Sequence, residues 1–297
     1  MAENVIEVVH FSDPGCPWAY SASPALATLR WRYGSQLNWR LTMIGLAENA
    51  DRYEERGYTP EMMASYNAHF RDEWGMPFDP RPKSRLSGTG YACRVVVAAR
   101  RIAPELELAV FRALQFTQFA TAAVFDDEAG VRPTLELFAA GANLDVDAVL
   151  AAVDDEETEA AYQADRAETR TAAGGPTEFQ GKSANSDGAE RYTAPSLLFK
   201  HSDGRSLEAG GFQPIEAYDV CVANLDATLE RRGPAEDVVQ AIEGVGYPLT
   251  TAEVAAVMAP PLTALDPAAA EVALVGATAA GLVHCVPVAS SALWLKL

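Results

Sequence analysis

The chain contains few of the residues that build metal sites and disulfide frameworks. Of its 297 residues only four are cysteine and four are histidine. The cysteines stand at positions 16, 93, 221 and 285, and no two of them form a Cys-x-x-Cys pair. This spacing indicates neither a structural zinc site nor a disulfide scaffold. We therefore expect no bound metal.

Basic residues are also scarce. The chain has 23 Lys and Arg residues against 41 Asp and Glu residues, which gives a net charge of −18. This charge disfavours nucleic acid and anionic membranes as partners and favours solubility. The hydrophobic share of 49% is enough for one large or two modest cores, so we expect a main domain with an insertion and an appendage.

Two further signals are missing. The N-terminus has no basic region followed by an apolar segment and a small-residue cleavage site, so we expect a cytoplasmic protein. A membrane-spanning segment is also not expected. Residues 272–295 contain no Asp, Glu, Lys or Arg, and the stretch is long enough to span a bilayer. Because Pro287, His284 and several Gly, Ser and Thr residues interrupt this stretch, we expect no membrane anchor.

Hydrophobic periodicity predicts an α/β protein. Strands are expected at 5–11 and 37–44, with a helix over 17–33 between them. The pattern becomes helical up to residue 189 and then predicts a hairpin of strands 196–200 and 206–209, followed by a helix over 214–231. Within the helical block the expected helices cover 60–74, 91–102, 105–119, 132–140, 146–153 and 156–172.

The last 65 residues or so form a separable C-terminal unit after Arg231-Arg232-Gly233-Pro234. Its pattern predicts three helices and two strands, which resembles a winged-helix module; they are expected at 235–243, 251–258, 267–281, 282–288 and 292–297. From residue 235 onward the unit has six acidic residues and a single basic one, Lys296. It therefore lacks the positive charge that attracts DNA phosphates. We expect a packing or dimerisation module, and a homodimer is one possible outcome.

The main candidate for chemistry is Cys16, which joins the first predicted strand to the first predicted helix. Its surroundings read His10-Phe11-Ser12-Asp13-Pro14-Gly15-Cys16-Pro17-Trp18-Ala19-Tyr20. Unpaired backbone N–H groups and the positive end of the helix dipole favour the thiolate at a helix start. Cys16 is therefore predicted to be a nucleophile with a lowered pKa. The alternative is a small buried hydrophobic residue.

The motif Asp-Pro-x-Cys-Pro-Trp-x-Tyr after a strand resembles the DsbA-like branch of the thioredoxin superfamily. Within this branch it resembles the FrnE-like proteins and their relatives, the 2-hydroxychromene-2-carboxylate isomerases and the kappa-class glutathione transferases. The resemblance implies a thioredoxin fold interrupted by a large helical insertion. The thioredoxin domain would cover 1–47 and 190–232, the insertion 48–189, and the C-terminal unit 233–297.

The disulfide oxidoreductases of this family carry Cys-Pro-x-Cys, whereas Ala19 stands at the second cysteine position here. The resemblance thus implies a thiol-disulfide oxidoreductase that works as a monothiol enzyme through Cys16. No bound cofactor is expected. A low-molecular-weight thiol of the glutathione or mycothiol type would act as cosubstrate and release the mixed disulfide. Cys93 could be a remote resolving thiol or a core residue, while Cys221 and Cys285 are expected to be inert.

A second motif, Arg191-Tyr192-Thr193-Ala194-Pro195, precedes the predicted hairpin. In the resembled family a cis-proline at this place lies beside the active-site cysteine, and the residue before it offers backbone groups to a thiol-bearing ligand. We therefore expect a cis Pro195, with Thr193 and Ala194 in the thiol-binding site. The remaining motif residues are assigned to the loop and the cleft, with Asp13 fixing the loop: Asp13, Pro14, Pro17, Trp18 and Tyr20.

Two rival functions stay open. One is a thiol-dependent isomerase or transferase, acting on a small-molecule substrate. Those relatives generally carry Ser in place of Cys16 and a Gly-Gln-Asp signature, whereas this chain has Gly210-Gly211-Phe212-Gln213-Pro214. The other is a catalytically silent thioredoxin-fold protein that keeps the cleft to bind a partner or a thiol.

Overall fold

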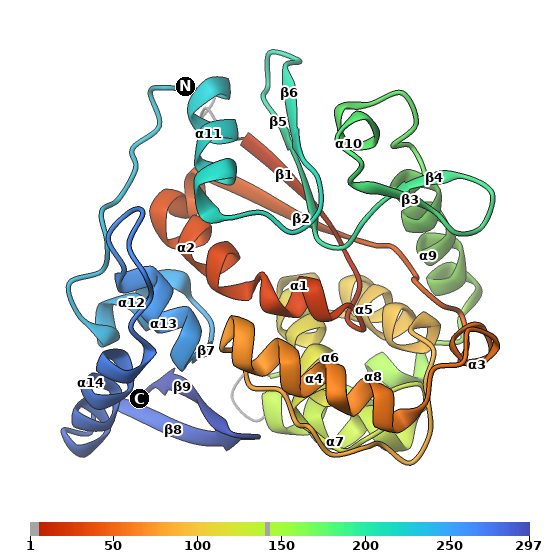
Figure 1. Ribbon diagram of the computed structural model, residues 1–297, viewed down its shortest axis with the longest axis horizontal. Coiled ribbons are helices and arrows are strands. Elements are labelled where there is room, and N and C mark those ends of the chain that lie inside the picture. Colours follow the sequence, from red (N-terminus) through yellow and green to blue (C-terminus); the bar gives the residue numbers. More distant parts are fainter. Residues whose placement is uncertain (1–5, 140–142) are drawn as a thin grey trace.

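The computed structural model describes residues 6–139 and 143–297 and is built around a four-stranded sheet (Figure 1). The strand order is β2 (Leu37–Met43), β1 (Ile6–Ser12), β5 (Ser196–Lys200) and β6 (Ser206–Ala209). β1 runs parallel to β2 and antiparallel to β5, which pairs antiparallel with β6. This is the predicted thioredoxin fold. The predicted first strand included Val5, and the predicted helix over 132–140 included residue 140. Both residues lie outside the described parts of the chain.

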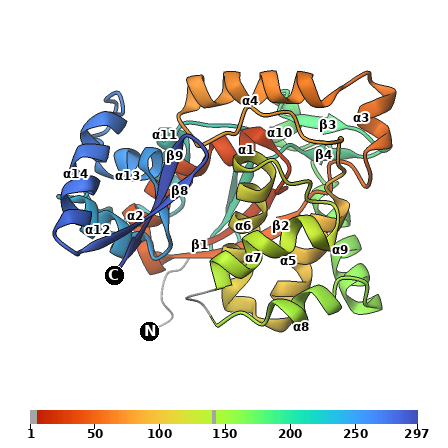
Figure 2. The ribbon, with the colours of Figure 1, turned by 90° about the horizontal axis from the view of Figure 1, so that it is seen from below.

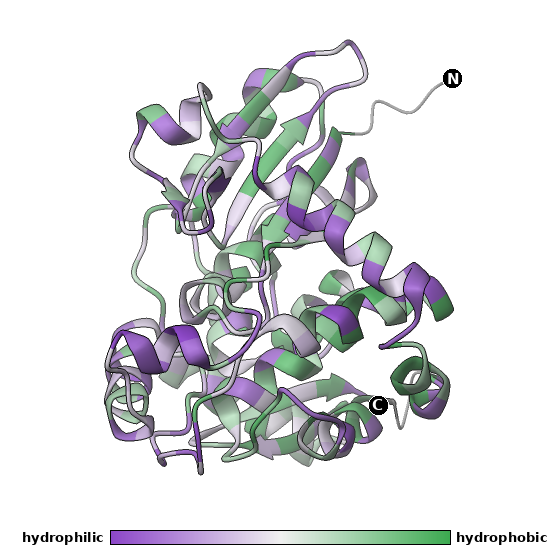
Figure 3. Cartoon of the chain, turned by 90° about the vertical axis from the view of Figure 1, so that its right-hand side faces the viewer, coloured by the Kyte–Doolittle hydropathy of each residue, from purple (hydrophilic) through white to green (hydrophobic). Residues whose placement is uncertain are grey.

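Both faces of the sheet are covered, which explains why β1 is buried nearly throughout. Ile6 and Val8 pack with helices α2 (Ser23–Tyr33) and α11 (Ile215–Leu225) on one face. On the other face, Leu41 and Met43 of β2 pack against helices of the insertion. Figure 3 shows hydrophobic stretches, in green, along the strands of the sheet beside hydrophilic ones in purple.

Two predicted helices differ from the structure for local reasons. The helix expected over 17–33 is divided into α1 (Pro17–Ser21) and α2, because Pro24 has no N–H to continue the hydrogen-bond ladder. The helix expected over 214–231 ends at Leu225. There the Asp226 carboxylate accepts the N–H and the hydroxyl of Thr228 at 2.8 and 2.6 Å, which favours a turn over a continuing helix.

The insertion between β2 and β5 is mostly helical, as expected. A short hairpin was not predicted; its strands β3 (Ser183–Asn185) and β4 (Glu190–Tyr192) lie across the expected domain boundary at residue 190. Its helices are α3 (Asp51–Glu55), α4 (Pro60–Trp74), α5 (Gly90–Ile102), α6 (Glu107–Ala120), α7 (Glu128–Ala139), α8 (Val146–Ala151), α9 (Glu156–Thr169) and α10 (Pro176–Phe179), with a 3-10 turn at Pro104–Leu106. Another 3-10 turn, Gly34–Gln36, lies before the insertion, between α2 and β2.

The C-terminal unit contains three helices and a three-stranded sheet in the order β7-β9-β8, beside α2 in Figures 1 and 2. Its helices fall within a few residues of the predicted ranges, while the short strand β7 was not predicted. Ala27 and Trp31 of α2 join its hydrophobic core. The elements are α12 (Val238–Val245), β7 (Leu249–Thr250), α13 (Thr251–Met258), α14 (Pro267–Ala279), β8 (Val283–Val288) and β9 (Ser291–Lys296).

None of the helices in residues 6–139 and 143–297 combines the length and apolar character needed to cross a membrane.

A buried ion pair ties the C-terminal unit to the insertion. Arg112 of α6 donates to both carboxylate oxygens of Glu253 of α13 at 2.7 and 2.9 Å. The two residues are 5% and 0% exposed. Glu253 also accepts the Thr250 N–H at 2.7 Å, and Arg112 donates to the Pro248 carbonyl at 3.1 Å. These bonds offset the cost of removing two charges from water.

We predict that Glu253→Gln lowers the free energy of unfolding by about 3 kcal/mol, because it leaves Arg112 buried without a counter-charge. Urea denaturation followed by circular dichroism measures the change. Asp147→Asn is the matched control, because its pair with Arg132 is exposed and worth less than about 1 kcal/mol. Equal losses in the two variants would contradict a structural role for the buried pair.

Candidate active site

The thiol of Cys16 lies where two distant segments of the chain meet. Cys16 immediately precedes α1, is 6% exposed, and its Sγ donates to the carbonyl oxygen of Ala194 at 3.2 Å. The Ala194-Pro195 peptide bond is cis, the conformation expected from the sequence. Pro195 leads directly into β5. The strand order of the sheet, with β1 beside β5, is what brings the two loops together.

The surroundings of the thiol are apolar. Cys16 belongs to a hydrophobic cluster with Val9, Phe11, Ala19, Ile44, Ala172, Tyr192 and Ala194. Burial in this cluster raises the pKa of Cys16 to about 12. Hydrogen bonds from the backbone N–H groups of Ala19 and Trp18 favour the thiolate, while the Asp13 charge disfavours it. The prediction of a lowered pKa is therefore wrong, because the start of α1 acts as expected but burial outweighs it.

Asp13 and Pro14 shape the loop that presents Cys16. Pro14 occupies the second position of a tight turn that is closed by the Cys16 N–H donating to the Asp13 carbonyl at 3.1 Å. The Asp13 side chain is fully buried, and its carboxylate accepts the N–H groups of Gly15 and Leu46, both at 2.8 Å. It also accepts the Thr89 hydroxyl at 2.9 Å. Asp13 thus joins the Cys16 loop to the segment after β2 and to the start of α5.

Gly15 is required by close packing in the same loop. A Cβ at this position would lie 2.5 Å from Cγ2 of Thr89 and 3.0 Å from the ring of Phe125. Any larger residue would push the loop away from α5 and move Cys16. This contact could not be predicted from the sequence, since Thr89 and Phe125 come from the insertion.

The other motif residues divide between the cleft and the core. Pro17 begins α1, and Trp18 is 44% exposed with its ring edge-on to Phe70 of α4 and to Phe212, at centroid distances of 4.9 and 5.4 Å. Tyr20 was expected in the cleft, but it is 1% exposed and its hydroxyl donates to the Pro77 carbonyl at 3.2 Å. Its ring packs among phenylalanines because it points inward from α1, so its role is structural.

The Thr193 hydroxyl donates to the carbonyl of Lys182, just before β3, at 2.6 Å. Of the three residues assigned to thiol binding, only Ala194 contacts Cys16 through a hydrogen bond.

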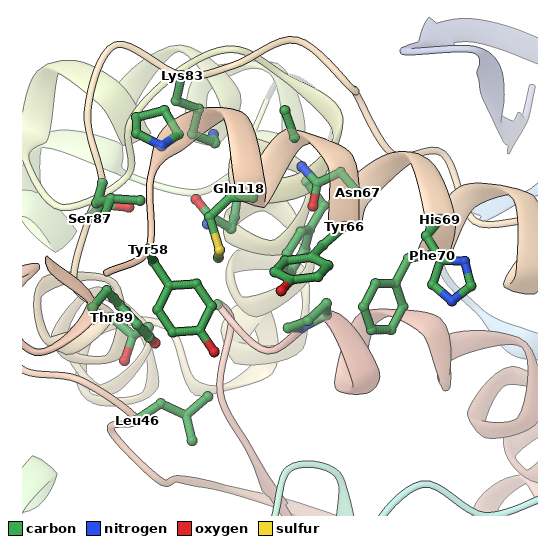
Figure 4. A pocket seen from close by; sticks show the side chains of 18 of the residues that line it. Leu46, Tyr58, Tyr66, Asn67, His69, Phe70, Lys83, Ser87, Thr89 and Gln118 are labelled. Atoms are coloured by element: carbon green, nitrogen blue, oxygen red, sulfur yellow. The ribbon is translucent and has the colours of Figure 1, made fainter. Parts of the chain in front are cut away.

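A cavity of about 460 Å³ adjoins the Cys16 loop between α4 and the segment 81–89 (Figure 4). Its size is within the range of small-molecule sites. Gly15, Pro17 and Trp18 form one wall. The rest of the lining is rich in aromatic rings that the sequence did not reveal as site residues, because they come from the insertion; they are Tyr53, Tyr58, Tyr66, Phe70 and Phe119.

The basic residues of this cavity are already engaged. Lys83 donates to the carbonyl oxygens of Thr117 and Thr121, both at 3.3 Å, and to that of Ala123. Arg81 and Arg85 form ion pairs with neighbouring aspartates. Burial lowers the pKa of Lys83 to about 8. With its basic groups paired, the cavity presents mainly aromatic surface.

Cys93 of α5 is fully buried and makes a different contact from Cys16. Its thiol donates to the Asp13 carboxylate at 3.5 Å, and burial raises its pKa. Cys221 and Cys285 are half-buried, and all four cysteines are free. Across the described parts of the chain, no group of three His, Cys, Asp or Glu residues is placed to hold a metal ion.

The comparisons with known proteins agree with this geometry. The family model of the DSBA-like thioredoxin domain matches residues 7–194. The cytosolic disulfide reductase DsbM from Pseudomonas aeruginosa has a similar structure, with a TM-score of 0.53 and 18% identity, over 75% of this chain and 100% of that one. Its structure with GSH gives a TM-score of 0.51 at 18% identity, over 74% of this chain and 100% of that one.

A "probable DsbA oxidoreductase" from Streptomyces coelicolor has a TM-score of 0.52 and 19% identity, over 78% of this chain and 93% of that one. At these identities the structural likeness concerns the fold. No curated protein matches the chain.

We predict that Cys16 of the free protein reacts slowly with iodoacetamide at pH 7 and that the rate rises about tenfold per pH unit up to pH 10. The reason is that its raised pKa leaves the thiolate fraction growing throughout this range. Peptide mapping by mass spectrometry gives the rate for each cysteine, with Cys16→Ser as the control. A rate that levels off below pH 8 would show that the thiol is ionised despite its burial.

Proposed function

The chain belongs to the DSBA-like thioredoxin-domain family, and on this premise we propose that it is a thiol-disulfide oxidoreductase that works through Cys16 alone. The observation that carries the proposal is the contact between the Cys16 Sγ and the Ala194 carbonyl, 3.2 Å away in the loop of the cis Pro195. A disulfide that reaches Cys16 would lie along this loop, whose backbone groups can orient it. Ala19 at the second motif position supports the one-cysteine form.

The proposed reaction has two exchange steps. The Cys16 thiolate attacks one sulfur of a disulfide, forms a mixed disulfide with it, and releases the other sulfur as a thiolate. The thiolate of a small thiol then attacks the substrate sulfur of this mixed disulfide. The bond to Cys16 breaks, and Cys16 leaves as the regenerated thiolate. The net result is the exchange of one thiol for another in the disulfide, with no net electron transfer to the protein.

The chain itself offers Cys16 no nearby partner for the second step. Ala19 has no thiol, and the thiol of Cys93 is bound to Asp13 in the fully buried interior. We therefore assign the second step to an external thiol of the glutathione or mycothiol class. The structure of DsbM with GSH supports this class, since a protein of similar fold is associated there with a small thiol.

One observation favours a second function, that of a silent binding protein. The 6% exposure of Cys16 and its pKa of about 12 hold the free protein in the thiol form at neutral pH. A protein that only binds a thiol or a partner would need no thiolate. In that case Cys16→Ser would retain full binding of the small thiol, whereas the proposed exchange requires the sulfur.

We predict that Ala19→Cys creates a disulfide reductase. The new Cys-Pro-Trp-Cys pair can resolve the mixed disulfide within the protein, which should accelerate dithiothreitol-driven reduction of insulin at least about tenfold over the native chain. Turbidity of the insulin solution measures the rate. The double variant Ala19→Cys with Cys16→Ser should be inactive.

The one-cysteine mechanism fails if the native protein already oxidises a dithiol substrate without an added small thiol and Cys93→Ala abolishes this activity. Cys93 would then be the resolving thiol.

A further inference from the structure

A small cavity lies where the thioredoxin sheet, the insertion and the C-terminal unit meet. Its volume is about 20 Å³, which is room for about one ligand the size of a water molecule. Because the space is so small, the polar side chains around it lie close to one shared position. They come from β1, α2, β2, α6 and the segment before β7, and include His10, Arg30, Trp39, Arg112 and Tyr247.

The lining of this cavity is basic, although the chain as a whole has a net charge of −18. Arg30 and Arg112 both line it, and no Asp or Glu from the described parts of the chain does. The charge of Arg112 is compensated from behind by its ion pair with Glu253. The charge of Arg30 is therefore the one that the cavity leaves to be balanced.

Arg30 is a half-buried cation without a carboxylate beside it. Burial lowers its pKa to about 10, so the guanidinium stays protonated at pH 7. The charged or titratable groups that act on it are Arg112, which repels it, and Tyr247, whose phenol is neutral at pH 7 because burial raises its pKa. The Arg30 Cζ lies 3.9 Å from the centroid of the Trp39 ring, so the cation is held against an aromatic face at the cavity wall.

Three further nitrogen atoms of the lining side chains have no hydrogen-bond partner in the part of the chain that the structure describes. They are Nε2 of His10, Nε1 of Trp39 and Nε of Arg112, and all three are buried. His10 and Arg112 are only 3% and 5% exposed. Burial and the Arg30 charge lower the pKa of His10 to about 3, so its ring is neutral at pH 7 and can donate from Nε2. Unsatisfied buried groups are rare, and their meeting at one cavity indicates a shared acceptor.

We propose that this cavity is a binding site for a single halide ion, with chloride as the physiological ligand. A water molecule accepts only about two hydrogen bonds, fewer than Arg30, Trp39 and Arg112 together offer, and it brings no charge to balance Arg30. A halide accepts from every direction and supplies that charge. Phosphate and carboxylate groups carry several oxygens and need more space than about 20 Å³. The site uses none of the Cys16 chemistry and does not rest on the proposed function.

Thermal unfolding tests the site with chloride as the probe. Sodium chloride is exchanged for sodium gluconate, a carboxylate too bulky for the cavity, at a constant total of about 200 mM, so that surface charges are screened equally. The Tm of the native protein should rise by at least about 2 °C and level off with increasing chloride, because the ion binds the folded chain and not the unfolded one. Equal Tm values in the two salts would overturn the proposal.

Three variants locate the effect within the chain. Arg30→Met removes the charge and should abolish the chloride-dependent shift in Tm. Trp39→Phe keeps an aromatic ring but removes one N–H, so it should raise the chloride concentration at half of the shift at least about threefold. Arg56→Met is the matched control, because Arg56 is exposed at the end of α3, and it should respond like the native chain. A native response in both Arg30→Met and Trp39→Phe would refute the site.

Crystals of the native protein soaked in sodium bromide show directly where a halide binds, since bromide scatters anomalously. An anomalous peak is expected inside the cavity, between the guanidinium of Arg30 and the indole N–H of Trp39. Bromide peaks confined to the protein surface, with none in this cavity, would contradict the proposal even if chloride raises the Tm.

Discussion

The Cys16 thiol is held against the Ala194 carbonyl at the junction of two loops that flank adjacent strands, and the chemistry of the site depends on this burial. The contact shields the sulfur from water and fixes it next to backbone groups that can orient a disulfide. It also raises the energy of the thiolate, so the protein must supply compensating interactions. The backbone N–H groups of Trp18 and Ala19 at the start of α1 supply such an interaction.

The insertion contacts the Cys16 loop directly, whereas the C-terminal unit supports the site only through the helices it packs against. The insertion closes the loop from one side, because Asp13 is held by Thr89 and Gly15 packs against it, and it builds the aromatic cavity beside Trp18. The C-terminal unit packs on the far end of α2 and is tied to α6 by the Arg112–Glu253 pair. Through α2 and α6 it supports the scaffold and does not touch the thiol.

The sequence predicted the sheet, most helices and the meeting of Cys16 with Ala194-Pro195, since these follow from periodicity and from two recognisable motifs. It did not predict the cavity, because Tyr58, Tyr66 and Phe70 become neighbours of Trp18 only through the packing of α4. It also missed the sign of the Cys16 pKa shift. A helix start can be recognised in a sequence, whereas the desolvation of the thiol by Phe11, Ile44 and Tyr192 depends on tertiary structure. For the same reason Tyr20 was misplaced in the cleft.

The central claim is that Cys16 alone exchanges with a small thiol, and the product of that exchange is its most direct test. Native protein is incubated with oxidised glutathione, and the adducts are located by intact mass and peptide mapping. The account predicts one glutathione per chain at Cys16, released by added reduced glutathione, and no such adduct in Cys16→Ser. A chain that stays unmodified, or an adduct that persists at Cys221 or Cys285 in Cys16→Ser while Cys16 of the native protein remains free, would contradict it.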